Sequence, residues 1–273
     1  MTMDHLLREH APISDGGWAL LDREAKERLT VALGARKMVD FAGPFGWEYS
    51  ATNLGRTESI TGPALADGVA TRRRGVLPLV EMRAPFKVSR LELLDHDRGA
   101  ADVDLTDLAE AAMQIAIAEN AAVFHGWRQV GIEGVTSATP HSPVPRVTDF
   151  NDYPKRVAKA VSALLQAGIG GPFGLALGPG HYTAVVEATE RGGYLLSEHL
   201  RKLLGGPIVW APGVRGAIVM SLRGGDFLFE SGQDLSVGYD RHDEEFVYLY
   251  IEQSFSFRVA TPEAGIHLTG SDG

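Results

Sequence analysis

Near the end of the chain, apolar side chains recur at almost every second position over an unusual length. The apolar positions that share one face are Val247, Leu249, Ile251, Phe255, Phe257 and Val259. The opposite face carries Tyr248, Tyr250, Glu252, Ser254, Ser256 and Arg258. A period of two is that of a β-strand, and residues 247–259 would extend for about 40 Å at about 3.3 Å per residue. Most strands have about five or six residues, so this run predicts an elongated, sheet-rich subunit.

A second constraint is the segment from residue 39 to residue 79, which has no helical period. Glycine and proline divide it into short extended pieces: Gly43-Pro44, Gly46, Gly55, Gly62-Pro63, Gly68 and Gly75. Loops longer than about 15 residues without structure of their own are uncommon in compact domains. We therefore expect an extended hairpin or arm that packs against another chain, and we interpret the segment as a sign of assembly.

Four helices are predicted, the first three of them from the spacing of apolar residues. The first spans residues 14–33, and its apolar stripe lies either on this chain's own body or on a neighbour. The second, residues 105–124, follows the capping residue Asp104 and is apolar on more than one face, so we expect a buried central helix. The region of the third alternates helix and strand, which favours a small α/β subdomain: helix 153–166, strand 173–177 and a helix near 182–188.

Composition excludes several classes of protein. The 273 residues are enough for one large domain or two closely packed ones. The chain has no cysteine, which rules out disulfides, thiolate metal sites and thiol nucleophiles. A formal net charge of −9 argues against nucleic-acid binding, and we expect the basic run Arg72-Arg73-Arg74 in a solvated loop. No run reaches the roughly 18 apolar residues of a membrane span and no signal peptide is visible, so we expect a cytoplasmic protein.

No motif for catalysis, metal binding or nucleotide binding stands out. The nine histidines are isolated from one another, and H-E-x-x-H, G-x-S-x-G, G-x-x-x-x-G-K-[ST] and G-x-G-x-x-G are all missing. We interpret residues 223–227 and 240–245 as turns. The sequence has 35 Asp and Glu residues, but a catalytic acid–base pair among them can be recognised only from their positions in space. An enzymatic function therefore stays open as an alternative. Assembly is the more economical interpretation, and we assign no catalytic residue, metal ligand or cofactor site.

Six blocks of sequence occur in order along the chain. They are Ala11-Pro12-Ile13 before the Trp18 helix, Gly34-Ala35-Arg36-Lys37-Met38-Val39-Asp40, Gly43-Pro44-Phe45-Gly46-Trp47-Glu48-Tyr49, Leu77-Pro78-Leu79-Val80-Glu81-Met82-Arg83, Arg223-Gly224-Gly225-Asp226-Phe227 and Gly232-Gln233-Asp234-Leu235-Ser236-Val237-Gly238-Tyr239. Together they resemble the encapsulins, once described as linocin-type bacteriocins. The resemblance implies an α+β subunit with the tailed-bacteriophage major capsid protein fold. Subunits of that family close into icosahedral shells that hold an enzyme, and the shell is not the catalyst. A soluble hydrolase or a bacteriocin-like antibacterial protein is the alternative class, although no nucleophile and base motif supports it.

The resemblance also divides the chain into parts. We expect the N-terminal helix and the start of a peripheral domain in 1–49, an extended intersubunit loop in 50–75, the peripheral domain with its spine helix in 76–130, an axial domain in 131–222, and the remaining peripheral strands with the C-terminus in 223–273. By symmetry the copy number of such a shell is a multiple of sixty, and the length of the chain favours the smallest, sixty copies.

In the family, the cargo is a dye-decolorizing peroxidase or a ferritin-like iron-oxidising protein, which implies roles in oxidative stress or iron storage. A short C-terminal peptide tethers this cargo in a groove between the N-terminal helix and the peripheral sheet. The matching positions here are Arg36, Asp40 and Asp234, with apolar lining from Leu29, Leu33, Leu235 and Val237. Charged groups would set the register of the peptide, and apolar pockets would supply most of the affinity. An ordinary ion pair between Arg36 and Asp40 is the competing interpretation.

Two further expectations follow from the resemblance. The loop that lines the five-fold pore in the family matches Thr189, Glu190, Arg191, Gly192, Gly193 and Tyr194. Opposite charges on Glu190 and Arg191 leave the ion selectivity open, and a plain surface turn is the competing interpretation. Some relatives bind flavin through an exposed aromatic residue, but the matching position here is Arg90, so we expect no flavin.

Overall fold

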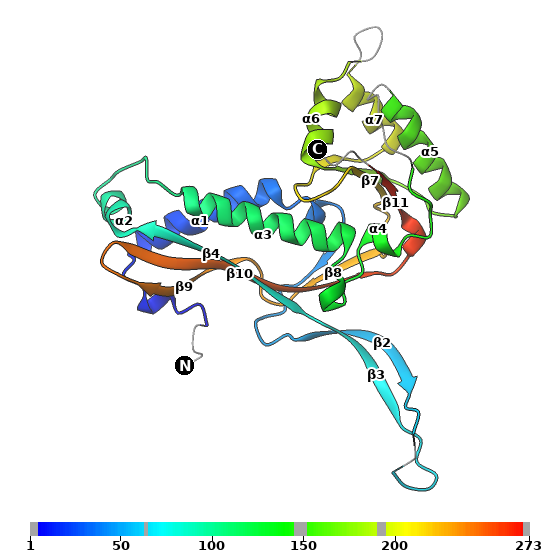
Figure 1. Cartoon of the computed structure of the whole chain (residues 1–273), viewed down its shortest axis with the longest axis horizontal. Helices are drawn as coiled ribbons and strands as arrows, with labels where there is room; N and C mark the ends of the chain where they lie inside the picture. The colour runs from blue at the N-terminus through cyan, green and yellow to red at the C-terminus, as the bar shows by residue number, and fades with distance from the viewer. Residues whose placement is uncertain (1–4, 63–64, 145–151, 190–194, 270–273) are drawn as a thin grey trace.

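The computed structural model describes residues 5–62, 65–144, 152–189 and 195–269, which form two lobes and a projecting hairpin (Figure 1). The first lobe is a five-stranded sheet with helices on one face. The second lobe is a four-stranded sheet with shorter helices around it. This arrangement has the mixed helix and sheet content that the sequence predicts.

The long strand β10 (Phe246–Val259) organises the first lobe. It pairs antiparallel with β4 (Val80–Ser89) along one side, and with β9 (Ser236–His242) and then β8 (Phe227–Ser231) along the other. Strand β1 (Asp40–Ala42) lies parallel to β8 and completes the sheet. The long strand expected from the alternating pattern is therefore confirmed.

Both faces of β10 are largely buried, which the alternating pattern does not indicate. Tyr250 and Glu252 belong to the more polar face, yet each is only 3% exposed. Arg83 of β4 covers them: its guanidinium lies 3.7 Å from the Tyr250 ring centre and 2.8 Å from the Glu252 carboxylate. The long arginine side chain can shield an aromatic ring while its charge stays near water, so a polar face becomes an interior one.

Helices α1 (Asp15–Ala32) and α3 (Thr106–His125) pack against each other over one face of this sheet, and α2 (Arg90–Asp97) follows β4 (Figure 1). The Ser14 hydroxyl caps α1 by accepting a hydrogen bond from the Gly17 N–H at 3.0 Å. The apolar stripe of α1 therefore lies on the chain's own body, which answers the question that its periodicity left open. α3 begins one residue later than expected, and the Asp104 carboxylate accepts from the Thr106 N–H.

The second lobe contains the remaining sheet, in the order β11-β7-β5-β6. Its strands are β5 (Phe173–Leu177), β6 (Ile208–Trp210), β7 (Ala217–Ser221) and β11 (Gly265–Leu268). Its helices are α4 (Val135–Ala138), α5 (Tyr153–Gln166), α6 (Pro179–Glu187) and α7 (Leu196–Leu204). Short 3₁₀ helices occur at η1 (Arg8–His10), η2 (Ala35–Lys37), η3 (Arg128–Val130) and η5 (Pro262–Ala264).

Two features of the second lobe differ from expectation. Residues 223–273 were expected to hold the remaining peripheral strands and the C-terminus, but residues 265–268 form β11, which pairs antiparallel with β7 because Ile266 and Leu268 complete the interior of the smaller sheet. The helix α7 was not predicted, although its apolar positions Leu196, Leu200 and Leu204 are buried at one-turn spacing. A helix of nine residues offers too few turns for a confident periodicity.

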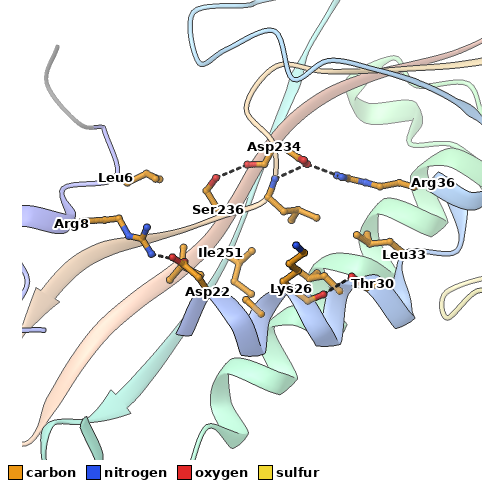
Figure 2. A pocket seen from close by; sticks show the side chains of 14 residues that line it. Leu6, Arg8, Asp22, Lys26, Thr30, Leu33, Arg36, Asp234, Ser236 and Ile251 are labelled. Carbon is orange, nitrogen blue, oxygen red and sulfur yellow. Dashed lines mark hydrogen bonds and ion pairs between the residues drawn. The ribbon is translucent and has the colours of Figure 1, made fainter. Parts of the chain in front are cut away.

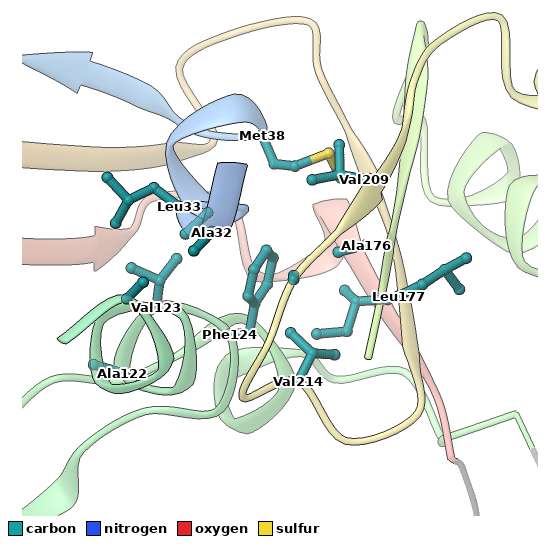
Figure 3. Packing of buried hydrophobic residues seen from close by; sticks show 14 of the residues in the cluster. Ala32, Leu33, Met38, Ala122, Val123, Phe124, Ala176, Leu177, Val209 and Val214 are labelled. Atoms are coloured by element: carbon teal, nitrogen blue, oxygen red, sulfur yellow. The ribbon is translucent and has the colours of Figure 1, made fainter. Parts of the chain in front are cut away.

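One hydrophobic core runs through both lobes. Figure 3 shows Phe124 of α3 between the end of α1 at Leu33 and the second-lobe residues Val214 and Leu177. All four side chains belong to the same buried cluster. The two lobes therefore share their interior, and the end of α1 sits at their junction.

A buried amide fixes that junction. The Asn120 side chain of α3 is fully buried and donates hydrogen bonds of 2.9 Å to the carbonyls of Ala32 and Pro212. Its oxygen accepts from the Ala35 N–H at 2.8 Å. Because its three partners are backbone groups at residues 32, 35 and 212, Asn120 ties these segments together and holds the end of α1 in one position.

The hairpin is formed by β2 (Ala51–Ser59) and β3 (Arg72–Pro78) and projects away from both lobes (Figure 1). The described residues between β1 and β4 contain no helix, as predicted. The run Arg72-Arg73-Arg74 begins β3 instead of lying in a loop, because it pairs across the hairpin with residues 57–59. Nearly every residue of the two strands is exposed or half-exposed.

Candidate binding groove

A groove of about 480 Å³ lies between α1 and the beginning of β9 (Figure 2). Its lining comes from four parts of the chain: the N-terminal segment, α1, η2 and the strands β9 and β10 with the turn before them. The lining residues are Leu6, Arg8, Asp22, Ala25, Lys26, Leu29, Thr30, Leu33, Arg36, Asp234, Leu235, Ser236, Val237 and Ile251.

The interior of the groove is apolar. Ala25, Leu29 and Leu33 follow one another at four-residue spacing, so a helix places them on one face. Val237 of β9 and Leu235, in the turn just before that strand, form the opposite wall. Walls of this kind bind apolar side chains by removing them from water.

One end of the groove is built around Arg36, which stands in η2 directly after α1. Its guanidinium bonds the Glu119 carboxylate at 2.9 Å, the Asp234 carboxylate at 2.7 Å and the Gln253 side-chain oxygen at 2.7 Å. It also lies 5.3 Å from the ring centre of Phe229. Three elements far apart in the sequence thus converge on one arginine.

The electrostatics of this cluster favour the charged state of Arg36. Burial lowers the pKa of Arg36, but the nearby Glu119 and Asp234 carboxylates and their hydrogen bonds raise it by more, so the net shift is upward. Glu119 is fully buried in α3, and its charge is tolerable there only because Arg36 neutralises it. Arg36 therefore holds the groove together as well as lining it.

The structure brings six of the seven predicted groove residues together and places the seventh elsewhere. Asp40 does not line the groove, and its carboxylate accepts a hydrogen bond from the Gly225 N–H at 2.6 Å. Gly225 has a left-handed φ of 82°, which glycine adopts at little cost and which turns its N–H towards Asp40. The expected alternative, an Arg36–Asp40 ion pair, is not formed, because Arg36 pairs with Glu119 and Asp234.

The other end of the groove was not predicted from the sequence. Leu6 and Arg8 lie there, away from Arg36 and Leu33 (Figure 2). The Arg8 guanidinium pairs with the Asp22 carboxylate and lies 4.1 Å from the Trp18 ring centre. The helical period extends the predicted lining to Ala25, Lys26 and Thr30, so these could have been found, but no local pattern places residues 6–8 beside α1.

The Lys26 ammonium group is a charge in the groove that is available to a ligand. Arg8 is paired with Asp22 at one end and Arg36 with Asp234 at the other. Lys26 stands between them, is exposed, and its ammonium group bonds no other described residue. The groove therefore offers apolar walls and a single unpaired cation at its middle.

The other predicted positions lie outside the groove. Thr189 is exposed and bridges to Leu195 between α6 and α7, whereas the pore-loop residues Glu190, Arg191, Gly192, Gly193 and Tyr194 lie outside the described residues. Arg90 begins α2, and its guanidinium donates to the Asp243 carbonyl at 3.0 Å. In the described ranges, no helix is long and apolar enough to cross a membrane, and no group of three acidic or histidine side chains could hold a metal ion.

Comparisons with known proteins agree on one family and one fold. The model of a family described as an encapsulating protein for peroxidase matches residues 3–256. A type 1 encapsulin shell protein of Rhodospirillum rubrum is 44% identical over 272 residues, covering 98% of this chain and 97% of that protein. The virus-like particle from Pyrococcus furiosus has a TM-score of 0.63 at 17% identity, covering 92% of this chain and 98% of that chain. The capsid of Myoviridae phage XM1 has a TM-score of 0.51 at 11% identity, covering 86% of this chain and 90% of that chain. The last two likenesses concern the fold alone.

Proposed function

The chain belongs to the encapsulin family of shell proteins, and we propose that its groove binds the C-terminal tail of the enzyme that the shell encloses. The protein has the capsid fold of tailed bacteriophages and assembles with copies of itself into a capsid-like particle. It is a structural shell protein and not an enzyme. The finer proposals concern the cargo, the copy number and the pore.

The observation that carries the cargo proposal is the combination of length, apolar lining and single free charge in the groove. From Asp22 to Leu33, α1 rises by about 16 Å at about 1.5 Å per residue. About five residues of extended peptide have the same length. Such a peptide would bury its apolar side chains against Leu29, Leu33 and Leu235, and a carboxylate in its middle would face Lys26.

The family description supports a peroxidase as the cargo class. A ferritin-like iron-oxidising cargo is the second possibility within the same groove. We propose that the loaded particle is cytoplasmic, holds sixty copies of the shell chain, and carries no flavin of its own. Sixty chains of 29.4 kDa would give a shell of about 1.8 MDa.

We also propose that residues 189–194 line a pore at a symmetry axis. The support is the position of Thr189, which is exposed in the connection between α6 and α7 of the second lobe. Which of Glu190 and Arg191 would face the opening sets the ion preference. A symmetric reconstruction of the particle would answer this, and a loop lying away from every axis would contradict the proposal.

The cargo proposal is tested by reversing one charge inside the groove and one outside it. The chain would be co-expressed with a dye-decolorizing peroxidase that carries its own C-terminal tail, and the peroxidase bound per purified particle would be measured. Lys26→Glu should lower loading several-fold, since it repels the carboxylate of the tail. Leu235→Asp should lower it further, because a charge enters the apolar wall.

Arg23→Glu is the matched control for Lys26→Glu. Arg23 is exposed on the same helix and changes charge by the same amount, but it does not line the groove. Particles of the Arg23→Glu chain should bind as much peroxidase as particles of the unmodified chain. Unchanged loading in both Lys26→Glu and Leu235→Asp particles would contradict the groove proposal, whereas loading of a ferritin-like protein in place of the peroxidase would correct only the cargo class.

A further inference from the structure

The N-terminal residues 5–8, which we call the strap, cross the edge of the five-stranded sheet at one end of the groove. The Leu6 carbonyl accepts a hydrogen bond of 2.8 Å from the Tyr239 N–H of β9. Before that bond, His5 stacks on Trp47, with ring centres 4.7 Å apart, and lies 3.3 Å from the Glu252 carboxylate. After it, Arg8 reaches α1. The strap thus passes from the face of the sheet that bears Glu252 to the face covered by α1.

Arg8 fastens the strap to α1 from inside the groove. Its guanidinium pairs with Asp22 and lies 4.1 Å from the centre of the Trp18 ring. Both Leu6 and Arg8 line the groove, and they lie at the end opposite Arg36 (Figure 2). A peptide that continues out of the groove at this end would meet the strap and compete with these contacts.

At the opposite end, no other segment of the described chain lines the groove beyond Arg36 and Asp234. Asp234 stands there with 41% of its side chain exposed, paired to Arg36. A bound peptide that leaves the groove past Asp234 does not compete with a backbone hydrogen bond like the one between the Leu6 carbonyl and the Tyr239 N–H. The two ends of the groove are therefore unequal.

We infer that the strap fixes the direction of the bound tail, with the free C-terminal end of the tail against Leu6 and Arg8 and the enzyme on the Arg36 side. This rests on the proposed cargo function. A tail attached to a folded enzyme must continue out of the groove on its N-terminal side, so that side takes the end without the strap. The terminal carboxylate then faces Arg8, whose guanidinium has five N–H donors and can serve both Asp22 and a second anion.

The test uses a fluorescent protein that ends in the C-terminal tail of the peroxidase, co-expressed with the shell chain. A second version carries five additional glycine and serine residues after the tail. In unmodified particles, we expect the extended tail to load at least about tenfold less, because the additional residues must displace the strap. In Arg8→Ala particles, we expect the extended tail to recover most of this loss, since the strap is no longer held to α1.

Arg28→Ala is the matched control for Arg8→Ala. Arg28 also makes an exposed ion pair, with Glu24 at 2.6 Å on the same helix, but it does not line the groove. The Arg28→Ala substitution should leave the lower loading of the extended tail unchanged. Hydrogen exchange at the Tyr239 N–H should become faster in Arg8→Ala particles only, which shows directly that the strap has loosened.

The outcomes separate this inference from the cargo proposal. Equal loading of both tails into unmodified particles would overturn the role of the strap and leave the groove intact. A penalty that persists in Arg8→Ala particles despite faster exchange at Tyr239 would do the same. No loading of either tail into unmodified particles would overturn the groove and the strap together.

Discussion

Arg36 in the groove and Arg73 on the hairpin make ion pairs of nearly the same length in very different surroundings. The Arg36 guanidinium lies 2.9 Å from Glu119, and the Arg73 guanidinium lies 2.8 Å from Glu58. The side chains of the first pair are 15% and 0% exposed, whereas those of the second are 74% and 65% exposed. In water an ion pair contributes little, while a buried charge that loses its partner is costly.

This contrast separates the groove, which contacts within one chain stabilise, from the hairpin, which we expect assembly to stabilise. The groove is preformed, because Arg36, Glu119 and Asp234 hold its end in the interior of one subunit. The hairpin has exposed strands on both sides, and an isolated two-stranded hairpin is at best marginally stable in water. We therefore expect the partners of the hairpin to be other copies of the chain.

The largest expected effect comes from removing the hairpin. Residues 54–75 would be replaced by Asn-Gly, which joins the cross-strand partners Asn53 and Val76 through a two-residue turn. We expect particles to be lost, because the proposed contact surface for other copies is removed, while the two lobes stay folded. Native mass spectrometry and negative-stain microscopy would follow assembly, and circular dichroism would follow folding. Intact particles of about 1.8 MDa from the shortened chain would contradict this assignment.

The next largest effect is expected at the groove. Arg36→Ala removes the only cation near the buried Glu119 carboxylate among the described residues. We expect the free energy of unfolding to fall by about 3–5 kcal/mol, the usual cost of leaving one partner of a buried pair uncompensated. Chemical denaturation followed by tryptophan fluorescence would measure it. A loss below about 1 kcal/mol would mean that Glu119 does not depend on Arg36.

The smallest effect is expected from the matching change on the hairpin. Arg73→Ala breaks an ion pair of the same length, but both of its side chains are solvated. We expect the free energy of unfolding to change by less than about 1 kcal/mol in the same denaturation experiment. A loss as large as that of Arg36→Ala would show that the hairpin is stabilised within its own chain, and the comparison would fail.

Much of the fold could be predicted from local patterns. The period of two predicted β10, the glycine and proline spacing predicted the hairpin, and the helical period of α1 placed Leu29 and Leu33 on one face. These features depend on neighbours within a few residues, which a sequence displays directly. The resemblance to encapsulins then placed six groove positions that the structure brings together.

The errors fall where distant segments meet. Asp40 was expected in the groove with Arg36, yet it bonds Gly225, because the turn after β7 presents an N–H to it. Residues 265–268 fall in the C-terminal stretch that was grouped with the peripheral strands and in which no strand was predicted, but they form β11 of the second sheet. Neither position is encoded by a local period, since each depends on which distant segment lies beside it after folding.

By itself, then, the sequence determined most elements of this protein, the apolar stripe of each of these elements, and the family that the chain resembles. The tertiary structure decided the partners of each charge: Arg36 meets Glu119, 83 residues away, and Asp234, 198 residues away. It also decided that residues 6 and 8 close one end of the groove. The physical reason is that side-chain periodicity is set by backbone geometry within a turn or a pleat, whereas a buried charge selects its partner only after packing has removed water from both.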